Sequence, residues 1–278
     1  MALIFHQNML DYGGRSALRN GTFTNAVAAI NGITGATYLA AGFTEVLYAG
    51  IPTQTNLPLI AQALDGGLNQ MAIIEVGTTA LGRREFIAIA WDNVSFPVTH
   101  VGRVLWNSFN RTWTAYSTVA GGAALQIYPL PVGMALGADT RGLAFIAGTR
   151  ALTGRRYLIA FMHNMYNLGN KTAAFESLNV MATRARTSVG ANYTNVKVII
   201  GGDFNLEPRT RKRARGDQEL FYSRAALAGP GAYVNTTNVH PYDFWVVNDV
   251  NITDASTQVF VQTRVAHGSD HAGITVTL

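Results

Sequence analysis

Residues 196–208 read VKVIIGGDFNLEP: an apolar run, two glycines and then the polar residues Asp203 and Asn205. A short apolar run that ends in turn residues predicts a buried strand, here over 196–201. Asp203 and Asn205 stand two positions apart, so both side chains can face one side if the chain stays extended. In layered α/β folds, ligands gather where strands end. The stretch therefore predicts a core strand and one edge of a functional site.

The same stretch runs directly into a basic segment. Its positively charged residues are Arg209, Arg211, Lys212, Arg213 and Arg215. Since the net charge of the whole chain is +5, the remaining residues sum to about zero. A local basic segment favours phosphate-rich partners such as nucleic acid or anionic lipid. A solvated loop that keeps a weakly charged protein in solution fits the same pattern, and the segment alone does not choose between them.

The composition limits the classes of protein and of site. The chain has 278 residues, 48% hydrophobic and only 13% charged, so it can bury a full core unaided. The absence of cysteine excludes disulfides, zinc–thiolate sites and thiol nucleophiles. No apolar run reaches the ~18 residues of a membrane span, and the N-terminus does not read as a signal peptide. We expect one domain over 1–278 without a transmembrane segment; secreted and cytoplasmic locations both stay open.

Recurring short apolar runs predict a chain that is rich in strands. The predicted strands are 2–8, 37–41, 70–75, 86–91, 142–147, 156–162, 196–201, 243–247, 258–265 and 272–277. Apolar periodicity predicts helices at 22–32, 56–65 and 171–189. Because these helices fall between strands in the sequence, we expect mixed sheets with helices packed outside them. The segments 118–141 and 207–231 are predicted to be long loops.

Polar residues that can do chemistry stand at the ends of these strands. They are Asn8, Glu45, Glu75, His163, Asp203, Asn205, Asp243, Asp270 and His271. For any one of them, a cap or a turn is the ordinary explanation. Their common position at strand ends indicates instead a shared rim that binds a ligand.

The order of these motifs resembles the endonuclease/exonuclease/phosphatase superfamily, the group of deoxyribonuclease I. The matching stretches are HQNML (6–10), FTEV (43–46), IIEVGTTALGRREFIAIAWDN (73–93), LIAFMHNMYN (158–167), GGDFNLEP (201–208), YDFWVV (242–247) and GSDHAGITVTL (268–278). The chain departs from the family at Gln7 and Thr44, where the family usually carries Trp and Gln. The resemblance implies a four-layer α/β/β/α sandwich of two mixed, mainly antiparallel sheets.

Roles for the polar residues follow from this chemistry and from the resemblance. His271 is expected to be the general base, because imidazole titrates near working pH. The resemblance implies that Asp243 orients it and that Asp270 belongs to the metal and phosphate cluster. Glu45, with Asn8, offers hard oxygen ligands to Mg²⁺, with Mn²⁺ or Ca²⁺ as alternatives.

Further roles concern the phosphate. Asn205 is expected to bond the scissile phosphate, with Asn8 also in contact with substrate, and Asp203 to position water or a second metal. His163, backed by Glu75, is expected to act as an acid or to stabilise the transition state. Arg209, Arg211 and Arg213 are expected to contact phosphates that flank the cut. The other histidines, His6, His100, His240 and His267, are interpreted as structural, although His6 lies close enough to Asn8 in sequence to line the site.

Three functions are compatible with these features. The first is a metal-dependent phosphodiester hydrolase, a DNA endonuclease of low sequence specificity, with an inhibitor or immunity-type protein as a further partner. The second is a phosphoinositide phosphatase or sphingomyelinase-type lipid phosphoesterase, which changes substrate through loops on the same core. An exposed aromatic hairpin at 105–116 would favour it, but a strand pair packed in the core is the preferred interpretation of that segment. The third is a binding module with a vestigial site.

Overall fold

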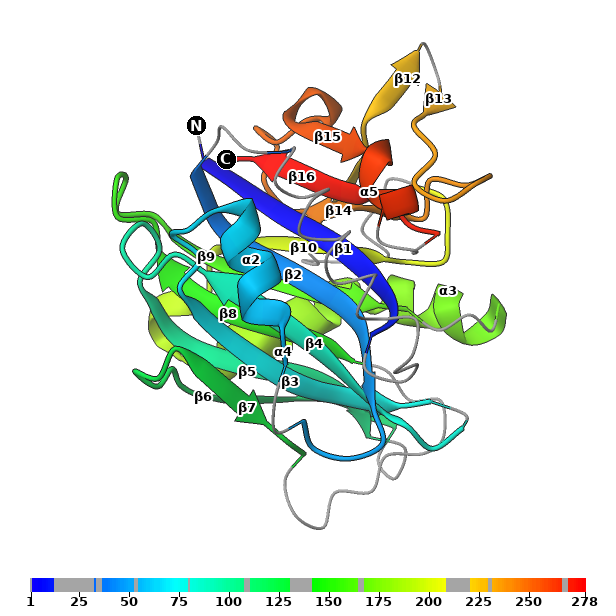
Figure 1. Cartoon of the computed structure of the whole chain (residues 1–278). Helices are drawn as coiled ribbons and strands as arrows, with labels where there is room; N and C mark the ends of the chain where they lie inside the picture. Colours follow the sequence, from blue (N-terminus) through cyan, green and yellow to red (C-terminus); the bar gives the residue numbers. More distant parts are fainter. Residues whose placement is uncertain are drawn as a thin grey trace.

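Two sheets stack face to face in this protein, with helices on their outer surfaces (Figure 1). The computed structural model describes residues 2–12, 33, 37–52, 55–79, 81–107, 111–130, 142–164, 168–208, 221–229, 232–266 and 270–278. Each large sheet has seven strands. The parallel neighbours are β1–β2, β3–β7 and β9–β10, and the other pairs are antiparallel. The four-layer sandwich of two mixed, mainly antiparallel sheets is confirmed.

The first sheet has the strand order β15-β16-β1-β2-β4-β3-β7. Its strands are β1 (Ala2–Tyr12), β2 (Thr37–Tyr48), β3 (Gln70–Thr78), β4 (Arg84–Trp91), β7 (Leu125–Tyr128), β15 (Thr257–Phe260) and β16 (Gly273–Thr277). β1 lies parallel to β2 and antiparallel to β16. Segments from opposite ends of the sequence therefore lie side by side in this sheet (Figure 1).

The second sheet has the strand order β11-β14-β10-β9-β8-β5-β6. Its strands are β5 (Val98–Asn107), β6 (Thr112–Val119), β8 (Leu143–Thr149), β9 (Arg156–His163), β10 (Lys197–Asp203), β11 (Tyr222–Arg224) and β14 (Asp243–Val247). β10 is parallel to β9 on one side and antiparallel to β14 on the other. Two short strands, β12 (Leu227–Gly229) and β13 (Ala232–Tyr233), form a separate pair.

Apolar side chains form three packed layers, one between the sheets and one outside each. The inner layer includes Ile74, Ile87, Phe161, Ile199 and Trp245. Helix α2 (Leu57–Leu64) buries Leu57, Ile60 and Leu64 against the first sheet. Helices α3 (Leu168–Glu176) and α4 (Leu178–Val189) bury Phe175, Leu178 and Met181 against the second. None of the helices that the structure describes is long and apolar enough to cross a membrane.

The two glycines that precede Asp203 allow β10 to pack closely against its neighbours. A Cβ atom on Gly201 would lie 2.4 Å from the Trp245 ring, and one on Gly202 would lie 2.1 Å from the Met162 carbonyl oxygen. A backbone atom of the neighbouring strand cannot move away cheaply, so a larger residue at position 202 is excluded. The close approach holds the end of β10 level with the ends of β9 and β14.

Most predicted strands are present, and two predicted elements differ. The run 258–265 is not one strand, because β15 ends at Phe260 and α5 (Val261–Ala266) follows. Thr263 Oγ1 donates to the Phe260 carbonyl oxygen and accepts a hydrogen bond from the Gly273 N–H, which stabilises this turn. The helix at 171–189 is two helices, and Ser177 between them bonds the Ala173 carbonyl with its hydroxyl.

The described residues of the aromatic segment, 105–107 and 111–116, lie in β5 and at the start of β6, which pair as antiparallel strands. Trp113 is buried in the layer under α4, 5.3 Å from the Trp106 ring. The strand-pair interpretation is therefore confirmed. The segments 118–141 and 207–231, predicted as loops, contain β7 and the strands β11 and β12. The predicted helix 22–32 lies outside the described residues.

Candidate functional site

The candidate site lies between the two sheets at one end, because strand alternation turns its side chains inward. In β9, Ile159 and Phe161 belong to the layer between the sheets, and His163 continues this inward series. Asp203 is paired with His163 on β9 and with Asp243 on β14. The strand register therefore places an imidazole and two carboxylates side by side.

His271 joins this row from the first sheet. Its Nδ1 atom lies 2.7 Å from Asp243 Oδ2, and both side chains are buried. Gln7 Nε2 donates a hydrogen bond to the His271 carbonyl oxygen at 2.9 Å, which holds the residue against β1. A carboxylate at Nδ1 keeps a proton on that nitrogen. The other ring nitrogen, Nε2, faces Asp203 Oδ2 at 3.6 Å.

The charge of His271 is set by opposing effects. Burial by itself lowers the pKa of His271, but the nearby carboxylates of Asp243, Asp203 and Asp270 outweigh it and raise the pKa to about 10. The His271 side chain is therefore a positively charged imidazolium at neutral pH, unless a cation offsets these carboxylates.

This charge predicts how stability depends on pH. With EDTA present, we expect the free energy of unfolding to fall as the pH rises from 6.5 to about 10. The folded protein holds a proton on His271 through this window and the unfolded chain does not, so the stabilisation is complete below the window and lost above it. Urea unfolding at both limits, on the wild type and on His271→Ala, measures the effect. An equal loss of stability in both proteins would contradict it.

Asp203 is the centre of the site. Its Oδ2 atom accepts a hydrogen bond from Asn8 Nδ2 at 3.1 Å and lies 3.7 Å from His163 Nε2 and 3.6 Å from His271 Nε2. Its Oδ1 atom accepts from the Asn205 backbone N–H at 2.8 Å. Two imidazole nitrogens and one side-chain amide thus surround the Oδ2 atom of Asp203.

Asn205 is fixed beside this centre by its backbone. It adopts a left-handed conformation with φ of +51°, which asparagine tolerates better than most residues. Its side-chain Nδ2 donates to the Asn164 carbonyl oxygen at 3.0 Å. An amide nitrogen carries two hydrogens, so this contact leaves a second one for an acceptor such as a phosphate oxygen.

The residue that backs His163 is Glu85, and the expected pairing with Glu75 is wrong. His163 Nδ1 lies 2.7 Å from Glu85 Oε1. Ile74 and Val76 face the other sheet, so Glu75 between them points to the opposite side of β3. There its carboxylate accepts hydrogen bonds from Arg84 and from the Leu130 backbone N–H. Glu75 is therefore removed from the candidate catalytic residues.

The predicted metal ligands all border the Asp203 centre. Glu45 Oε2 lies 4.0 Å from His163 Nε2, and Asp270 Oδ1 lies 3.5 Å from His271 Nε2. Glu45 is delivered by an irregularity in β2, where the pairing with β4 shifts and its φ is +56°. A further group whose atoms lie close enough to hold a metal ion is Asp203, Asp243 and His271. The assignment of Glu45, Asn8 and Asp270 as the ligands stays a prediction.

His6 also lies at this site, although the sequence was interpreted as giving it a structural role. Its Nε2 atom is 3.0 Å from Thr44 Oγ1, and its Nδ1 atom is 3.9 Å from Asp243 Oδ1. Burial lowers the pKa of His6 to about 3, so the imidazole is neutral. Both missed residues lie on the inner face of their strands: His6 is in step with Ile4, and Glu85 with Ile87, which face the other sheet. In β4 both faces are buried, so alternation in the sequence does not mark this face.

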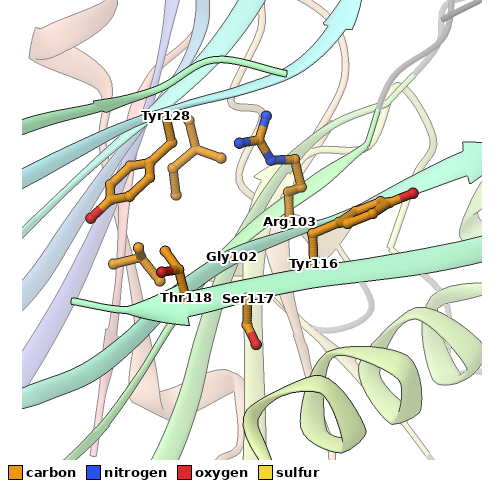
Figure 2. A pocket seen from close by; sticks show the side chains of 8 residues that line it. Gly102, Arg103, Tyr116, Ser117, Thr118 and Tyr128 are labelled. Carbon is orange, nitrogen blue, oxygen red and sulfur yellow. The ribbon is translucent and has the colours of Figure 1, made fainter. Parts of the chain in front are cut away.

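A separate pocket lies at the edge of the sandwich, between strands β3, β5, β6 and β7 (Figure 2). Tyr116 and Tyr128 line it together with the guanidinium of Arg103 (Figure 2). Arg103 donates to the carbonyl oxygens of Glu75 and Pro129, both at 2.8 Å. Its hydrogen bonds thus tie the strand that carries Glu75 to β5, and the pocket contains none of the candidate catalytic residues.

The basic residues Arg209, Arg211 and Arg213 lie outside the described part of the chain. The described residues stop at Pro208, three positions after Asn205, and resume at Phe221. Their predicted contacts with phosphate stay a prediction that rests on the sequence.

Comparison with known proteins identifies the fold. No protein-family model and no curated protein matches the sequence. Similar solved structures include the catalytic domain of human nocturnin with bound sulfate, at TM-score 0.60 and 14% identity over 99% of this chain and 93% of that one. An endonuclease/exonuclease/phosphatase from Bacteroides vulgatus has a TM-score of 0.60 and 16% identity, over 99% of this chain and 97% of that one. A mannosyl-6-phosphatase from Bacteroides thetaiotaomicron has a TM-score of 0.58 and 15% identity, over 100% of this chain and 99% of that one. The resemblance to the endonuclease/exonuclease/phosphatase fold is confirmed.

Proposed function

We propose that this protein is a divalent-cation-dependent phosphodiesterase that cleaves DNA with little sequence specificity. One observation carries the proposal: two buried histidines, each with a carboxylate 2.7 Å from Nδ1, direct their Nε2 atoms at the same Asp203 oxygen. Two oriented imidazoles are what phosphate ester hydrolysis needs, one to accept a proton from water and one to stabilise charge on the phosphoryl oxygens.

The proposed division of labour follows from the two partners. His271 Nε2 takes the proton from the attacking water as the water oxygen bonds to phosphorus, and Asp243 stabilises the imidazolium that forms. The P–O bond to the leaving alkoxide breaks, and the alkoxide takes a proton from the solvent. His163, held by Glu85, donates a hydrogen bond to the phosphate and offsets negative charge there. Asn205 Nδ2 holds a non-bridging oxygen of the same phosphate. Asp203 orients the water, since its Oδ2 atom lies between the two imidazoles.

The donor set fits a divalent cation. Five carboxylates meet two histidines here, and the carboxylate residues are Glu45, Glu85, Asp203, Asp243 and Asp270. Two imidazoles supply at most two positive charges, so the site as it stands would repel a phosphate. Oxygen ligands of this kind suit Mg²⁺, with Mn²⁺ or Ca²⁺ as alternatives, and Glu45, Asn8 and Asp270 are the residues proposed to hold it. When bound, the cation neutralises phosphate charge, and it would also lower the pKa of His271 toward the neutral form that a base requires.

The basic segment after Asn205 favours nucleic acid over other phosphoesters. Five positive charges within 209–215 can contact phosphates on both sides of a cut. The related folds act on varied phosphates: one is described as a mannosyl-6-phosphatase, and another is a 2′,3′-cyclic phosphatase in complex with adenosine-2′,3′-vanadate. Among the described aromatic residues of 105–116, Trp113 is buried, which favours the strand-pair interpretation over an element for membrane contact.

Supercoiled plasmid provides the test. The protein is incubated with plasmid in Mg²⁺ and in EDTA, beside reactions that contain an RNA oligonucleotide, phosphoinositide or sphingomyelin. We expect nicking of the plasmid that requires the cation. Cleavage of RNA alone, or release of phosphate or choline phosphate from the lipids without nicking, would overturn the assignment to DNA. No hydrolysis of any of these substrates would overturn the phosphodiesterase.

The two glutamates give a matched pair of variants. Glu85→Gln is expected to lower kcat about tenfold, because it removes the charged acceptor from His163 Nδ1. Glu75→Gln is expected to leave kcat nearly unchanged and to lower the thermal midpoint, because it weakens the pair between the buried Glu75 and the partly exposed Arg84 on the far side of the strand. Steady-state kinetics and thermal unfolding of both variants check this. A larger loss of kcat in the Glu75 variant would restore the original assignment.

A further inference from the structure

Two buried polar atoms face each other across the interface between the sheets. His6 Nδ1, on β1, lies 3.9 Å from Asp243 Oδ1, on β14. Both side chains are fully buried, and neither atom has a hydrogen-bond partner among the described residues. Buried polar atoms without a partner are costly and uncommon, so a facing donor and acceptor call for an explanation.

The chemistry of the neighbours decides which nitrogen of His6 carries the proton. Thr44 Oγ1 lies 3.0 Å from Nε2, and a hydroxyl can donate or accept, so Thr44 fits either tautomer. Asp243 does not, because a carboxylate oxygen repels a nitrogen lone pair and attracts an N–H. The favoured tautomer therefore has the proton on Nδ1, directed at Asp243 Oδ1, with Thr44 donating to Nε2.

The distance of 3.9 Å also decides how the two groups interact. A bridging water would need two hydrogen bonds of about 2.8 Å each, which do not fit into this gap unless sharply bent. A direct hydrogen bond needs the two atoms to approach by about 1 Å. The His6 ring stacks on Phe161, with 6.0 Å between the ring centroids and 18° between the planes, so the ring is supported on one face while Nδ1 stays directed at Asp243.

We propose that His6 is a positioning residue for the Asp243–His271 pair. The Asp243 carboxylate then has both oxygens engaged, Oδ1 by His6 Nδ1–H and Oδ2 by His271 Nδ1–H. Thr44, His6, Asp243 and His271 form one chain of hydrogen bonds that runs from the first sheet to the second and back. Without His6 the carboxylate can rotate, and the Nε2 atom of His271 loses its fixed direction toward Asp203. The kinetic consequence rests on the proposed function, whereas the hydrogen bond itself does not.

Three substitutions separate positioning from packing. His6→Phe keeps a ring and removes both nitrogens. His6→Asn places an amide N–H near the Nδ1 position, and His6→Gln places one near the Nε2 position. We expect His6→Phe and His6→Gln to lower kcat about tenfold with little change in KM, and His6→Asn to restore most of the loss. Equal kcat in all four proteins, or rescue by glutamine but not asparagine, would overturn the proposal.

Two controls make the result independent of other failures. In an Asp243→Asn background, His6→Phe should cause no further loss of kcat, because its effect passes through that carboxylate; an additive loss would point to packing alone and overturn the proposal. The NMR resonance of the His271 Nδ1 proton should shift in His6→Phe and not in His6→Asn. This spectrum needs no turnover, so it tests the hydrogen bond even if the protein cleaves no phosphodiester. An unchanged resonance in His6→Phe would overturn the proposal.

Discussion

Replacing His271 with alanine should lower kcat for plasmid nicking by about 10³-fold, the largest effect we expect from any single side chain. His271 has the Asp243 carboxylate at Nδ1, and its Nε2 atom lies 3.6 Å from Asp203 Oδ2 and 3.5 Å from Asp270 Oδ1. Alanine removes the proton acceptor but leaves the rest of the site in place, so the loss should appear in kcat more than in KM.

A matched control uses another histidine. His100 on β5 bonds its neighbour Thr99 and lies outside the candidate site. His100→Ala should therefore keep full activity, and comparison of the two variants in Mg²⁺ removes general effects of the substitution. If His271→Ala nicks plasmid at a rate close to that of the wild type, His271 is not the base.

Asp203→Asn should lower kcat by about 10²-fold to 10³-fold. The substitution keeps the shape of the side chain and removes its charge. The two imidazoles 3.6 Å and 3.7 Å from Oδ2 then lose the negative charge beside them, and Asn8 Nδ2 can meet an N–H in place of an oxygen. Both changes disturb the site where charge develops on the phosphate.

The corresponding control is Asp92→Asn. Asp92 is also buried at the end of a strand, where Oδ1 accepts from the Val94 N–H. Its substitution should affect thermal stability while kcat stays near the wild-type value. Plasmid nicking and thermal unfolding of both variants distinguish the outcomes. Full activity of Asp203→Asn would leave the two histidines without a demonstrated common purpose.

Apolar runs and periodicity were sufficient to predict mixed sheets with helices outside them, and the four layers were implied by the resemblance to a known family. The sequence was less informative where apolar residues recur without a break signal across two elements. In 258–265 the run contains a strand and a helix, and their junction depends on Thr263, whose hydroxyl bonds Phe260 and Gly273. The Gly273 contact comes from β16, so no local pattern could reveal it. The strands β5 and β6 were placed only in part, because polar residues such as Arg103 interrupt them.

The site was predictable as a set of strand ends but not as a set of partners. In β3 and β4 both faces are buried, so almost every position is apolar and alternation no longer marks the inner face. Glu75 and Glu85 therefore read alike. Only the pairing of the strands, with an irregularity between Glu75 and Gly77, shows which carboxylate reaches His163. The role of His6 was missed because its partner Asp243 lies far away in sequence, on the other sheet.

The backbone conformation of Glu45 sets the stability of the fold against the proposed role of its side chain in binding a cation. A glutamate at φ of +56° is strained, by roughly 1 kcal/mol or more, in a conformation that glycine adopts freely. Glu45→Gly should therefore raise the thermal midpoint while it abolishes cation-dependent activity. An unchanged thermal midpoint would show that the strain is negligible. Selection for heat resistance alone would favour such exchanges at this bend and produce a sturdier, inactive protein. Lineages under that pressure would keep the sandwich and lose the proposed activity.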